Sequence, residues 1–240
     1  MRHLNLTWPA NRQRERFVEH EVLAPGRLPV STFLPTGYEP NYPYPLMVLF
    51  HPRGGDEQRA LSLAPRFSER NYVCIGLRGP KHAPVRGEGA GAAGYSWGTD
   101  GRFDGLLEEY VFRAVEQTRR LYHVHSERIY LAGLCEGSLQ AYRLALAYPE
   151  RFAGVISLNG TLPQYGTPLF RWPAVRQLRA FVGHGMANPF APLSLARRDF
   201  RLLYTAGLDV TMSVYPATHR LHPAMFRDVN RWIMDAVNAE

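Results

Sequence analysis

The stretch Ile129-Tyr130-Leu131-Ala132-Gly133-Leu134-Cys135-Glu136-Gly137-Ser138 decides the fold of this chain. It reads as a buried strand that turns sharply into the helix-compatible run 139–148, which Pro149 stops. Cys135 stands at the apex of the turn, and glycines two residues before and after it relieve the crowding of a strained backbone. The apex side chain is therefore expected at the top of a sheet. The adjoining helix would point its amino end at this side chain, which lowers the pKa of a thiol.

Strands and helices alternate along the rest of the chain. Apolar runs without alternation predict strands covered on both faces, at 46–50, 72–77, 129–132 and 154–158. Further extended segments are expected at 178–182 and 210–215. Amphipathic or capped stretches predict helices over 103–123, between Pro192 and Gly207, and from Met225 to Val237. The segments 16–23 and 28–34, separated by Ala24-Pro25-Gly26, predict a hairpin at the edge of the sheet.

This alternation predicts an α/β fold in a single domain, residues 1–240. We expect a mostly parallel central sheet with an antiparallel N-terminal edge and helices on both faces. Active sites in such folds lie at the carboxyl ends of the strands. Aromatic side chains in irregular segments near that end are candidates for an apolar substrate pocket, or for ordinary loop packing: Tyr95, Trp97, Phe170, Trp172 and Phe190.

Composition narrows the classes of function. The chain has 240 residues and a net charge of +7, and its arginines are scattered rather than gathered in a basic run, so nucleic acid is not an expected partner. Only a mild attraction for anionic substrates or surfaces follows from the charge. The two cysteines do not resemble the framework of a small secreted domain, and neither a signal peptide nor a membrane-spanning run is visible. The expected location is the cytoplasm.

From Leu46 onward the chain resembles the phospholipase/carboxylesterase branch of the α/β-hydrolase superfamily, which is related to the dienelactone hydrolases. Besides the elbow around Cys135, the landmarks are Leu49-Phe50-His51-Pro52-Arg53-Gly54-Gly55-Asp56, Leu77-Arg78-Gly79-Pro80, Tyr148-Pro149-Glu150-Arg151-Phe152, Val182-Gly183-His184-Gly185-Met186-Ala187-Asn188-Pro189 and Tyr215-Pro216-Ala217-Thr218-His219. The resemblance implies an α/β-hydrolase fold and acyl transfer through a nucleophile, a histidine and an acid. Most relatives carry serine where this chain has Cys135.

The resemblance assigns the general base to His219, which follows an apolar strand and precedes the last helix. His222 is the competing histidine, and a surface loop histidine is the plain alternative. A cysteine at a strand end is often only a small buried hydrophobe, and this is our interpretation of Cys74. His184 resembles a structural residue, and His51 resembles the histidine that orients the oxyanion loop.

The third member of the site departs from the family pattern, because Asn188 stands where relatives carry aspartate. Its side-chain oxygen can still accept a hydrogen bond from the histidine and hold the ring. In a thiolate–imidazolium pair the nucleophile is already deprotonated, so the histidine depends less on a negatively charged neighbour than it does with a serine hydroxyl. A cysteine at 135 and an asparagine at 188 are therefore compatible as a Cys-His-Asn set. Asp209 is the nearest later carboxylate, but it is expected at the opposite end of the sheet. A site without a third member is the remaining alternative.

Two backbone N–H groups are expected to hold the developing oxyanion, those of Glu136 and Arg53. Proline has no N–H, so Pro52 cannot serve where most relatives have glycine. The Arg53 and Glu136 side chains are expected near the mouth of the site, either paired with each other or facing a polar substrate.

The expected function is hydrolysis of carboxylic esters or thioesters through a cysteine acyl-enzyme. A lactone hydrolase of the dienelactone type is one alternative, and a catalytically silent hydrolase-like protein that binds a ligand or partner is another. No metal or organic cofactor is implied. The expected partner is a small-molecule substrate, and a homo-oligomer is left open.

Overall fold

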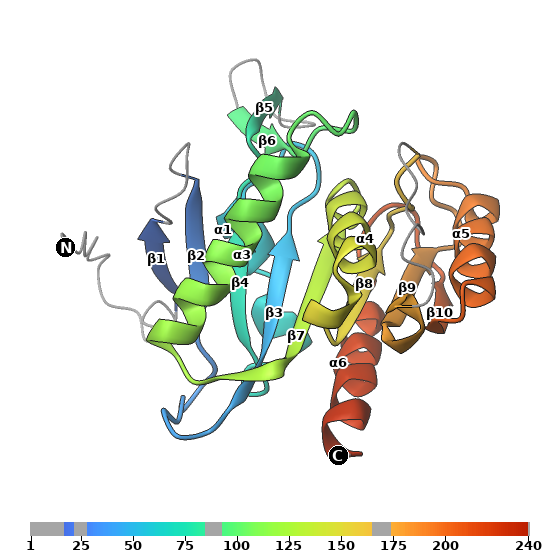
Figure 1. Cartoon of the computed structure of the whole chain (residues 1–240). Coiled ribbons are helices and arrows are strands. Elements are labelled where there is room, and N and C mark those ends of the chain that lie inside the picture. The colour runs from blue at the N-terminus through green and yellow to red at the C-terminus, as the bar shows by residue number, and fades with distance from the viewer. Residues whose placement is uncertain (1–16, 22–27, 85–92, 165–173, 240) are drawn as a thin grey trace.

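The computed structural model describes residues 17–21, 28–84, 93–164 and 174–239, which form an α/β fold around one large twisted sheet (Figure 1). The strand order in this eight-stranded sheet is β1-β2-β4-β3-β7-β8-β9-β10. Strand β1 pairs antiparallel with β2, β2 pairs antiparallel with β4, and the remaining neighbours are parallel. The expected architecture is therefore confirmed. The strands are β1 (Phe17–Glu21), β2 (Pro29–Phe33), β3 (Tyr44–Phe50), β4 (Val73–Leu77), β7 (Val124–Leu134), β8 (Gly154–Leu158), β9 (Arg179–Gly185) and β10 (Asp209–Tyr215).

Helices cover both faces of the sheet, and each face has its own core. On one face lie α3 (Asp104–Leu121), α4 (Gly137–Ala147) and α5 (Leu193–Thr205). On the other lie α1 (Glu57–Leu61), α2 (Ala64–Phe67) and α6 (Pro223–Asn238). Short 3-10 helices follow α4 at Pro149–Arg151 and precede β9 at Ala174–Gln177.

Strand β3 shows why the central runs are apolar throughout. All of its residues are buried, and they alternate between the two cores. Leu46, Val48 and Phe50 point to the α3–α4–α5 side, whereas Met47 and Leu49 point to the α1–α2–α6 side. Each residue of the strand therefore has an apolar neighbour to pack against, which removes the polar alternation of a half-exposed strand.

Some elements were not expected. The segment that carries Tyr95 and Trp97, which we expected to be irregular, contains the antiparallel hairpin of β5 (Lys81–Pro84) and β6 (Ala93–Ser96). The short helices α1 and α2 were not predicted, and β7 begins at Val124, five residues before its expected start. The turn at 24–26 and the pocket candidates Phe170 and Trp172 lie outside the described residues.

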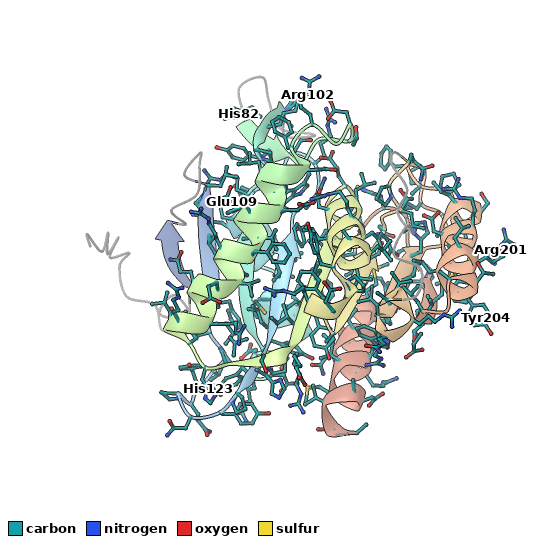
Figure 2. The ribbon with its side chains drawn as sticks, viewed as in Figure 1. His82, Arg102, Glu109, His123, Arg201 and Tyr204 are labelled. Carbon is teal, nitrogen blue, oxygen red and sulfur yellow. The ribbon has the colours of Figure 1, made fainter. Side chains whose placement is uncertain are left out.

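The parallel strands give the molecule two distinct ends. His82 lies on the β5–β6 hairpin above the carboxyl ends of the strands, whereas His123, just before β7, lies at the amino end (Figure 2). The elbow and the loops after β3, β9 and β10 all belong to the carboxyl end. Within the described part of the chain, no helix is both long and apolar enough to cross a membrane.

Candidate active site

The elbow between β7 and α4 has the strained geometry that the sequence predicts. Cys135 has φ +52°, in the left-handed region that residues with a side chain rarely adopt. Its N–H donates to the Leu158 carbonyl at 2.9 Å, and its own carbonyl accepts the N–H of Ser138 at 3.1 Å, so the apex is fixed on both sides. The eleven-residue helix α4 begins two residues later at Gly137. Backbone strain of this kind, held by its surroundings, is typical of functional sites.

Both elbow glycines are required by close backbone contacts. A Cβ atom on Gly133 would lie 2.3 Å from the Ser138 Cα, and one on Gly137 would lie 2.3 Å from the Phe50 carbonyl oxygen. These neighbours are backbone atoms, so they cannot rotate away. The glycines therefore allow β7, α4 and the end of β3 to approach one another closely beneath Cys135.

His219 lies in the loop between β10 and α6 and contacts Asn188 from the loop after β9. The His219 Nδ1 atom is 3.1 Å from Asn188 Oδ1. Asn188 is 4% exposed, and its Oδ1 atom also accepts the N–H groups of Phe190 at 3.1 Å and Ala191 at 3.3 Å. Two amide donors thus identify this atom as the oxygen, so the His219 Nδ1 must carry the proton and donate it. The opposite ring atom, Nε2, is then left as the basic nitrogen.

The alternatives to His219 and Asn188 occupy other places in the fold. His222 is the N-cap of α6, where its Nδ1 accepts the N–H of Ala224 at 3.2 Å and its ring stacks on Tyr215. Asp209 begins β10 at the amino end of the sheet and pairs with Arg179 at 3.2 Å. His222 therefore serves as a helix cap, and Asp209 forms an ion pair at the opposite end of the sheet from Cys135.

The oxyanion loop after β3 is held by backbone hydrogen bonds. The Gly54 N–H donates to the Tyr95 carbonyl at 2.8 Å, the Tyr95 N–H donates to the Gly55 carbonyl at 2.8 Å, and the Gly55 N–H donates to the Pro52 carbonyl at 2.9 Å. Because Pro52 has no N–H, Arg53 is the residue of this loop whose amide takes no part in these hydrogen bonds.

Two buried histidines stabilise this end of the sheet. The His51 Nε2 accepts the Gly79 N–H at 2.9 Å, so its Nδ1 carries the proton and donates to the Pro52 carbonyl at 2.7 Å. Burial lowers the pKa of His51 and favours this neutral form. His184 is also fully buried, with Nε2 2.7 Å from the Ala191 carbonyl, and burial lowers its pKa as well. Both positions fit the structural roles that the sequence suggested.

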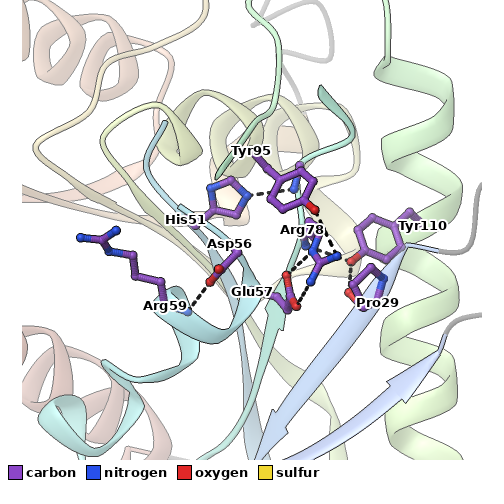
Figure 3. A network of polar contacts seen from close by, with 9 residues as sticks. Pro29, His51, Asp56, Glu57, Arg59, Arg78, Tyr95 and Tyr110 are labelled. Atoms are coloured by element: carbon purple, nitrogen blue, oxygen red, sulfur yellow. Dashed lines mark hydrogen bonds and ion pairs between the residues drawn. The ribbon is translucent and has the colours of Figure 1, made fainter. Parts of the chain in front are cut away.

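A buried ion pair secures the segment that follows β4 (Figure 3). The Glu57 carboxylate, at the start of α1, accepts two hydrogen bonds from the Arg78 guanidinium. The Tyr95 ring covers this guanidinium, with 4.7 Å from Cζ to the ring centroid. The Tyr110 hydroxyl accepts the Arg78 N–H at 3.0 Å and donates to the Pro29 carbonyl at 2.5 Å. The network joins α1, β4, β6, α3 and β2 beside Gly79, the partner of His51.

Comparison with known proteins identifies the family. The family model for phospholipase/carboxylesterase matches residues 45–236. The chain belongs to the phospholipase/carboxylesterase family.

Solved structures show the same fold. A thermostable esterase is 21% identical with a TM-score of 0.67 over 93% of this chain and 63% of its own, so this chain spans less than two thirds of that protein. The Bacillus cereus carboxylesterase is 19% identical with a TM-score of 0.63 over 87% of this chain and 94% of its own. A Mesorhizobium loti carboxylesterase is 17% identical with a TM-score of 0.70 over 90% and 98%. A search of the curated proteins found no significant match.

In this member of the phospholipase/carboxylesterase family, the candidate residues surround one pocket of about 770 Å³. Cys135, Glu136, His219, Arg53 and Phe190 all line it, and Asn188 lies behind His219. The Phe190 ring meets the His219 ring edge to face, with centroids 4.8 Å apart, and is 56% exposed. Of the aromatic pocket candidates that lie within the described residues, Phe190 is therefore the one that lines this pocket.

Tyr95 and Trp97 are not among the lining residues of this pocket, and of the two roles considered for them their contacts show packing. Trp97 is 1% exposed, and its indole N–H donates to the His51 carbonyl at 2.8 Å. Tyr95 binds the oxyanion loop through its backbone and covers Arg78 with its ring. Their rings therefore pack against other residues of the protein, because strand β6 lies beside the oxyanion loop.

The Glu136 carboxylate has partners for both of its oxygens. Its Oε1 atom accepts the Ser96 hydroxyl at 2.5 Å and the Trp97 N–H at 2.8 Å, and its Oε2 atom lies 3.7 Å from an Arg53 guanidinium nitrogen. Of the two arrangements expected for Arg53 and Glu136, the structure therefore shows the ion pair. The Arg53 side chain remains 61% exposed.

Asn159 was not identified from the sequence. It follows β8 directly, with φ +58° and 2% exposure. Its Nδ2 donates to the His219 carbonyl at 3.0 Å, and its Oδ1 accepts the Gly185 N–H at 2.8 Å. One side chain thus joins the His219 loop to the start of the Asn188 loop. The sequence does place Asn159 just past the carboxyl end of a predicted parallel strand, and this position could have marked it as a candidate site residue.

Proposed function

We propose that this chain hydrolyses carboxylic esters or thioesters with Cys135 as the nucleophile. The observation that supports this most directly is the His219–Asn188 hydrogen bond, because it leaves Nε2 of His219 as a base in the same pocket as the strained elbow residue Cys135. Family membership and the esterase folds support hydrolysis of an ester bond. The choice of cysteine as nucleophile is our own inference.

The first half of the reaction forms an acyl-enzyme. The Cys135 thiol gives its proton to Nε2 of His219, and the thiolate attacks the carbonyl carbon of the substrate. The N–H groups of Glu136 and Arg53 hold the negative oxygen of the tetrahedral intermediate. As this intermediate collapses, the carbon–oxygen or carbon–sulfur bond to the leaving group breaks, and imidazolium Nε2–H protonates the departing alkoxide or thiolate.

The second half releases the acid. Nε2 of His219 removes a proton from water, and the resulting hydroxide attacks the thioester carbonyl of acyl-Cys135. Collapse of the second intermediate expels the Cys135 thiolate, which takes back the proton from His219. Asn188 holds the ring through Nδ1 in both halves but cannot balance its positive charge as an aspartate would.

A panel of ester and thioester substrates tests this function against wild type, Cys135→Ser and Cys135→Ala. We expect wild type to turn over at least one substrate class, Cys135→Ala to lose that turnover, and a trapped acyl group on Cys135 to be visible by mass spectrometry. Cys74→Ala is the matched control, because that thiol lies in the core and burial raises its pKa. Equal turnover by wild type and Cys135→Ala would refute Cys135 as the nucleophile. No turnover, together with iodoacetamide labelling at the rate of an ordinary thiol, would refute the enzyme and favour a silent homologue.

A further inference from the structure

The Glu136 carboxylate binds a part of the chain that has no role in the proposed reaction. Glu136 follows Cys135 directly, and its side chain is 8% exposed. Its Oε1 atom accepts the Ser96 hydroxyl at 2.5 Å and the Trp97 N–H at 2.8 Å, at the end of β6. Ser96 and Trp97 are buried too, and neither is among the described residues that line the pocket. The two donors therefore belong to the interior of the protein and not to the surface that a substrate meets.

Strand β6, which lies above the carboxyl ends of the large sheet (Figure 1), is also bound to the oxyanion loop after β3. The Tyr95 carbonyl accepts the Gly54 N–H, and the Tyr95 N–H donates to the Gly55 carbonyl, both at 2.8 Å. The Trp97 indole N–H donates to the His51 carbonyl at 2.8 Å, where the loop begins. The end of β6 is therefore joined to the oxyanion loop at two places.

Close packing keeps the end of β6 in position. A Cβ atom on Gly94 would lie 2.1 Å from the Gly54 carbonyl oxygen, and one on Gly79 would lie 2.5 Å from the Ser96 carbonyl oxygen. Both neighbours are backbone atoms, which cannot rotate away as a flexible side chain could. The strand is thus held between the oxyanion loop and the segment after β4, and a residue that binds to it has a fixed point of attachment.

We propose that the Glu136 side chain is a positioning residue, which sets the spacing between the two donors of the oxyanion hole. These donors are the backbone N–H groups of Glu136 and Arg53, which belong to separate segments of the chain. The Glu136 carboxylate joins the elbow to Ser96 and Trp97, and Tyr95 joins the same strand to the loop that carries Arg53. The proposal rests on the proposed function, because it requires that an oxyanion forms at Cys135.

The hydrogen bonds to β6 should matter more than the ion pair between Glu136 and Arg53. The Glu136 Oε2 atom is 3.7 Å from the Arg53 guanidinium nitrogen, and the Arg53 side chain is 61% exposed, so water screens this attraction. Hydrogen bonds from the buried Ser96 and Trp97 donors to a carboxylate are charge-assisted and protected from water. We therefore assign the positioning role to these two bonds.

Hexyl trifluoromethyl ketone tests the oxyanion hole without turnover. The Cys135 thiolate adds to the carbonyl carbon of the ketone, a carbon–sulfur bond forms, and the π electron pair moves to oxygen as an alkoxide, while the thiol proton stays on His219. The adduct is reversible, and its Kd is measured as protection of Cys135 from iodoacetamide. Alkylation by iodoacetamide itself displaces iodide and forms no oxyanion. Its rate therefore depends on the thiolate and not on the oxyanion hole.

Ser96→Ala removes one of the two hydrogen bonds without changing a residue that lines the pocket. Loss of an oxyanion donor costs about 100- to 1,000-fold in kcat, and displacement of a donor that is still present should cost less. We expect the ketone Kd to rise about tenfold, and kcat for a hydrolysed ester to fall about tenfold with little change in KM. The iodoacetamide rate at Cys135 should change by less than about twofold.

Ser31→Ala is the matched control for this substitution. Ser31 is also buried, but its Oγ atom has no hydrogen-bond partner among the described residues. It lies on β2, which β4 and β3 separate from the elbow strand β7. The ketone Kd and the ester kcat of Ser31→Ala should equal those of wild type.

Substitutions of Glu136 separate hydrogen bonding from charge. In Glu136→Gln the amide oxygen can still accept the Ser96 and Trp97 donors, while the ion pair with Arg53 is lost. We expect the ketone Kd to rise about threefold in this variant and about 10- to 100-fold in Glu136→Ala, which loses both hydrogen bonds. Equal Kd values in the two variants would show that the charge matters and not the hydrogen bonds, which would overturn the proposal.

The remaining outcomes distinguish this proposal from the proposed function. A wild-type ketone Kd in folded Ser96→Ala and Glu136→Ala would overturn the positioning role and leave ester hydrolysis intact. An equal loss of ketone binding and of iodoacetamide reactivity would also overturn it, because the elbow as a whole would then be disturbed. If wild type formed no ketone adduct and hydrolysed no ester, the proposed function would be refuted, and the positioning role would be refuted with it.

Discussion

The side-chain oxygen of Asn188 accepts hydrogen bonds from Nδ1 of His219 and from the N–H groups of Phe190 and Ala191. One atom therefore shapes the loop after β9 and selects the tautomer of the histidine. The Nδ2 atom of Asn188 is buried and, among the described residues, has no hydrogen-bond partner. An aspartate would keep the three accepted bonds, remove this unsatisfied donor and add a charge beside the ring.

Substitution of Asn188 separates its orienting role from the effect of charge. We expect Asn188→Ala to lower kcat/KM for a hydrolysed ester by about 10- to 100-fold, because the Nδ1–H of His219 loses its acceptor, Asn188 Oδ1. Asn188→Asp should retain most activity and move the acidic limb of the pH–rate profile to higher pH, because a carboxylate stabilises the imidazolium. Thermal unfolding shows whether the loop itself is lost. Wild-type rates in a folded Asn188→Ala variant would contradict the orienting role.

The glycines of the elbow give a second prediction. Gly137→Ala brings a Cβ atom within 2.3 Å of the Phe50 carbonyl oxygen, so β3 and α4 must separate. We expect a loss of about 2–4 kcal/mol in the free energy of unfolding and a displaced Cys135 with reduced alkylation. Gly105→Ala is the control, because a Cβ atom there meets nothing within 4 Å and alanine favours helix α3. Equal stability of the two variants in urea unfolding would be inconsistent with this packing.

Most of the fold could be predicted from the sequence because the central strands are buried on both faces and the helices have one apolar side. Elements held by tertiary contacts were missed. Strand β5 is largely exposed and carries no alternating pattern, and β6 is positioned by the pairing of Tyr95 with Gly55. Helix α1 has only five residues and depends on the Asp56 cap and on burial against β4.

The site was predictable to the extent that it follows chain order. Cys135 after β7, Asn188 after β9 and His219 after β10 occupy the carboxyl ends of strands, where the resemblance placed them. The role of Trp97 was not predictable, because its N–H groups bind His51 and Glu136, which are distant in the sequence. Asn159 was missed for a similar reason, since its importance comes from joining two loops in space.

Asn159 lines the pocket but is nearly buried, and we expect its side chain to act mainly by positioning His219. Asn159→Gly removes the side-chain hydrogen bonds to the His219 and Arg220 carbonyls and from the Gly185 N–H, while accepting the positive φ of this position without strain. We expect kcat to fall by about tenfold with little change in KM, because the base is displaced while the pocket walls stay in place. Asn159→Asp keeps an acceptor for Gly185 but sets a carboxylate against the His219 carbonyl, so it should not restore the rate. A change in KM alone would point to a role in substrate binding instead.

The Glu57–Arg78 pair is expected to contribute to stability far more than ion pairs on the surface. Glu57 is 2% exposed, and Glu57→Gln leaves the Arg78 guanidinium, 28% exposed, without its charged partner. We expect the free energy of unfolding to fall by about 2–3 kcal/mol, somewhat less than for a fully buried pair. Glu116→Gln breaks the exposed pair with Arg120 and should cost about 0.5 kcal/mol or less. Chemical denaturation of both variants measures the two losses in the free energy of unfolding. Similar losses would show that the Glu57–Arg78 pair contributes no more to stability than the exposed pair.

The buried histidines predict how stability depends on pH. Burial lowers the pKa of His51 below the ordinary value of 6.5, so as the pH falls the unfolded chain takes up a proton before the folded one does. The stability that this group provides is therefore complete above the unfolded-state pKa and is lost progressively below about pH 6.5. We expect the free energy of unfolding to decline between about pH 7 and pH 5, and to decline less steeply in His51→Gln, whose amide oxygen can still accept the Gly79 N–H. His123→Gln, at an exposed position, should keep the wild-type slope, and an unchanged slope in His51→Gln would show that this imidazole does not govern the acid response.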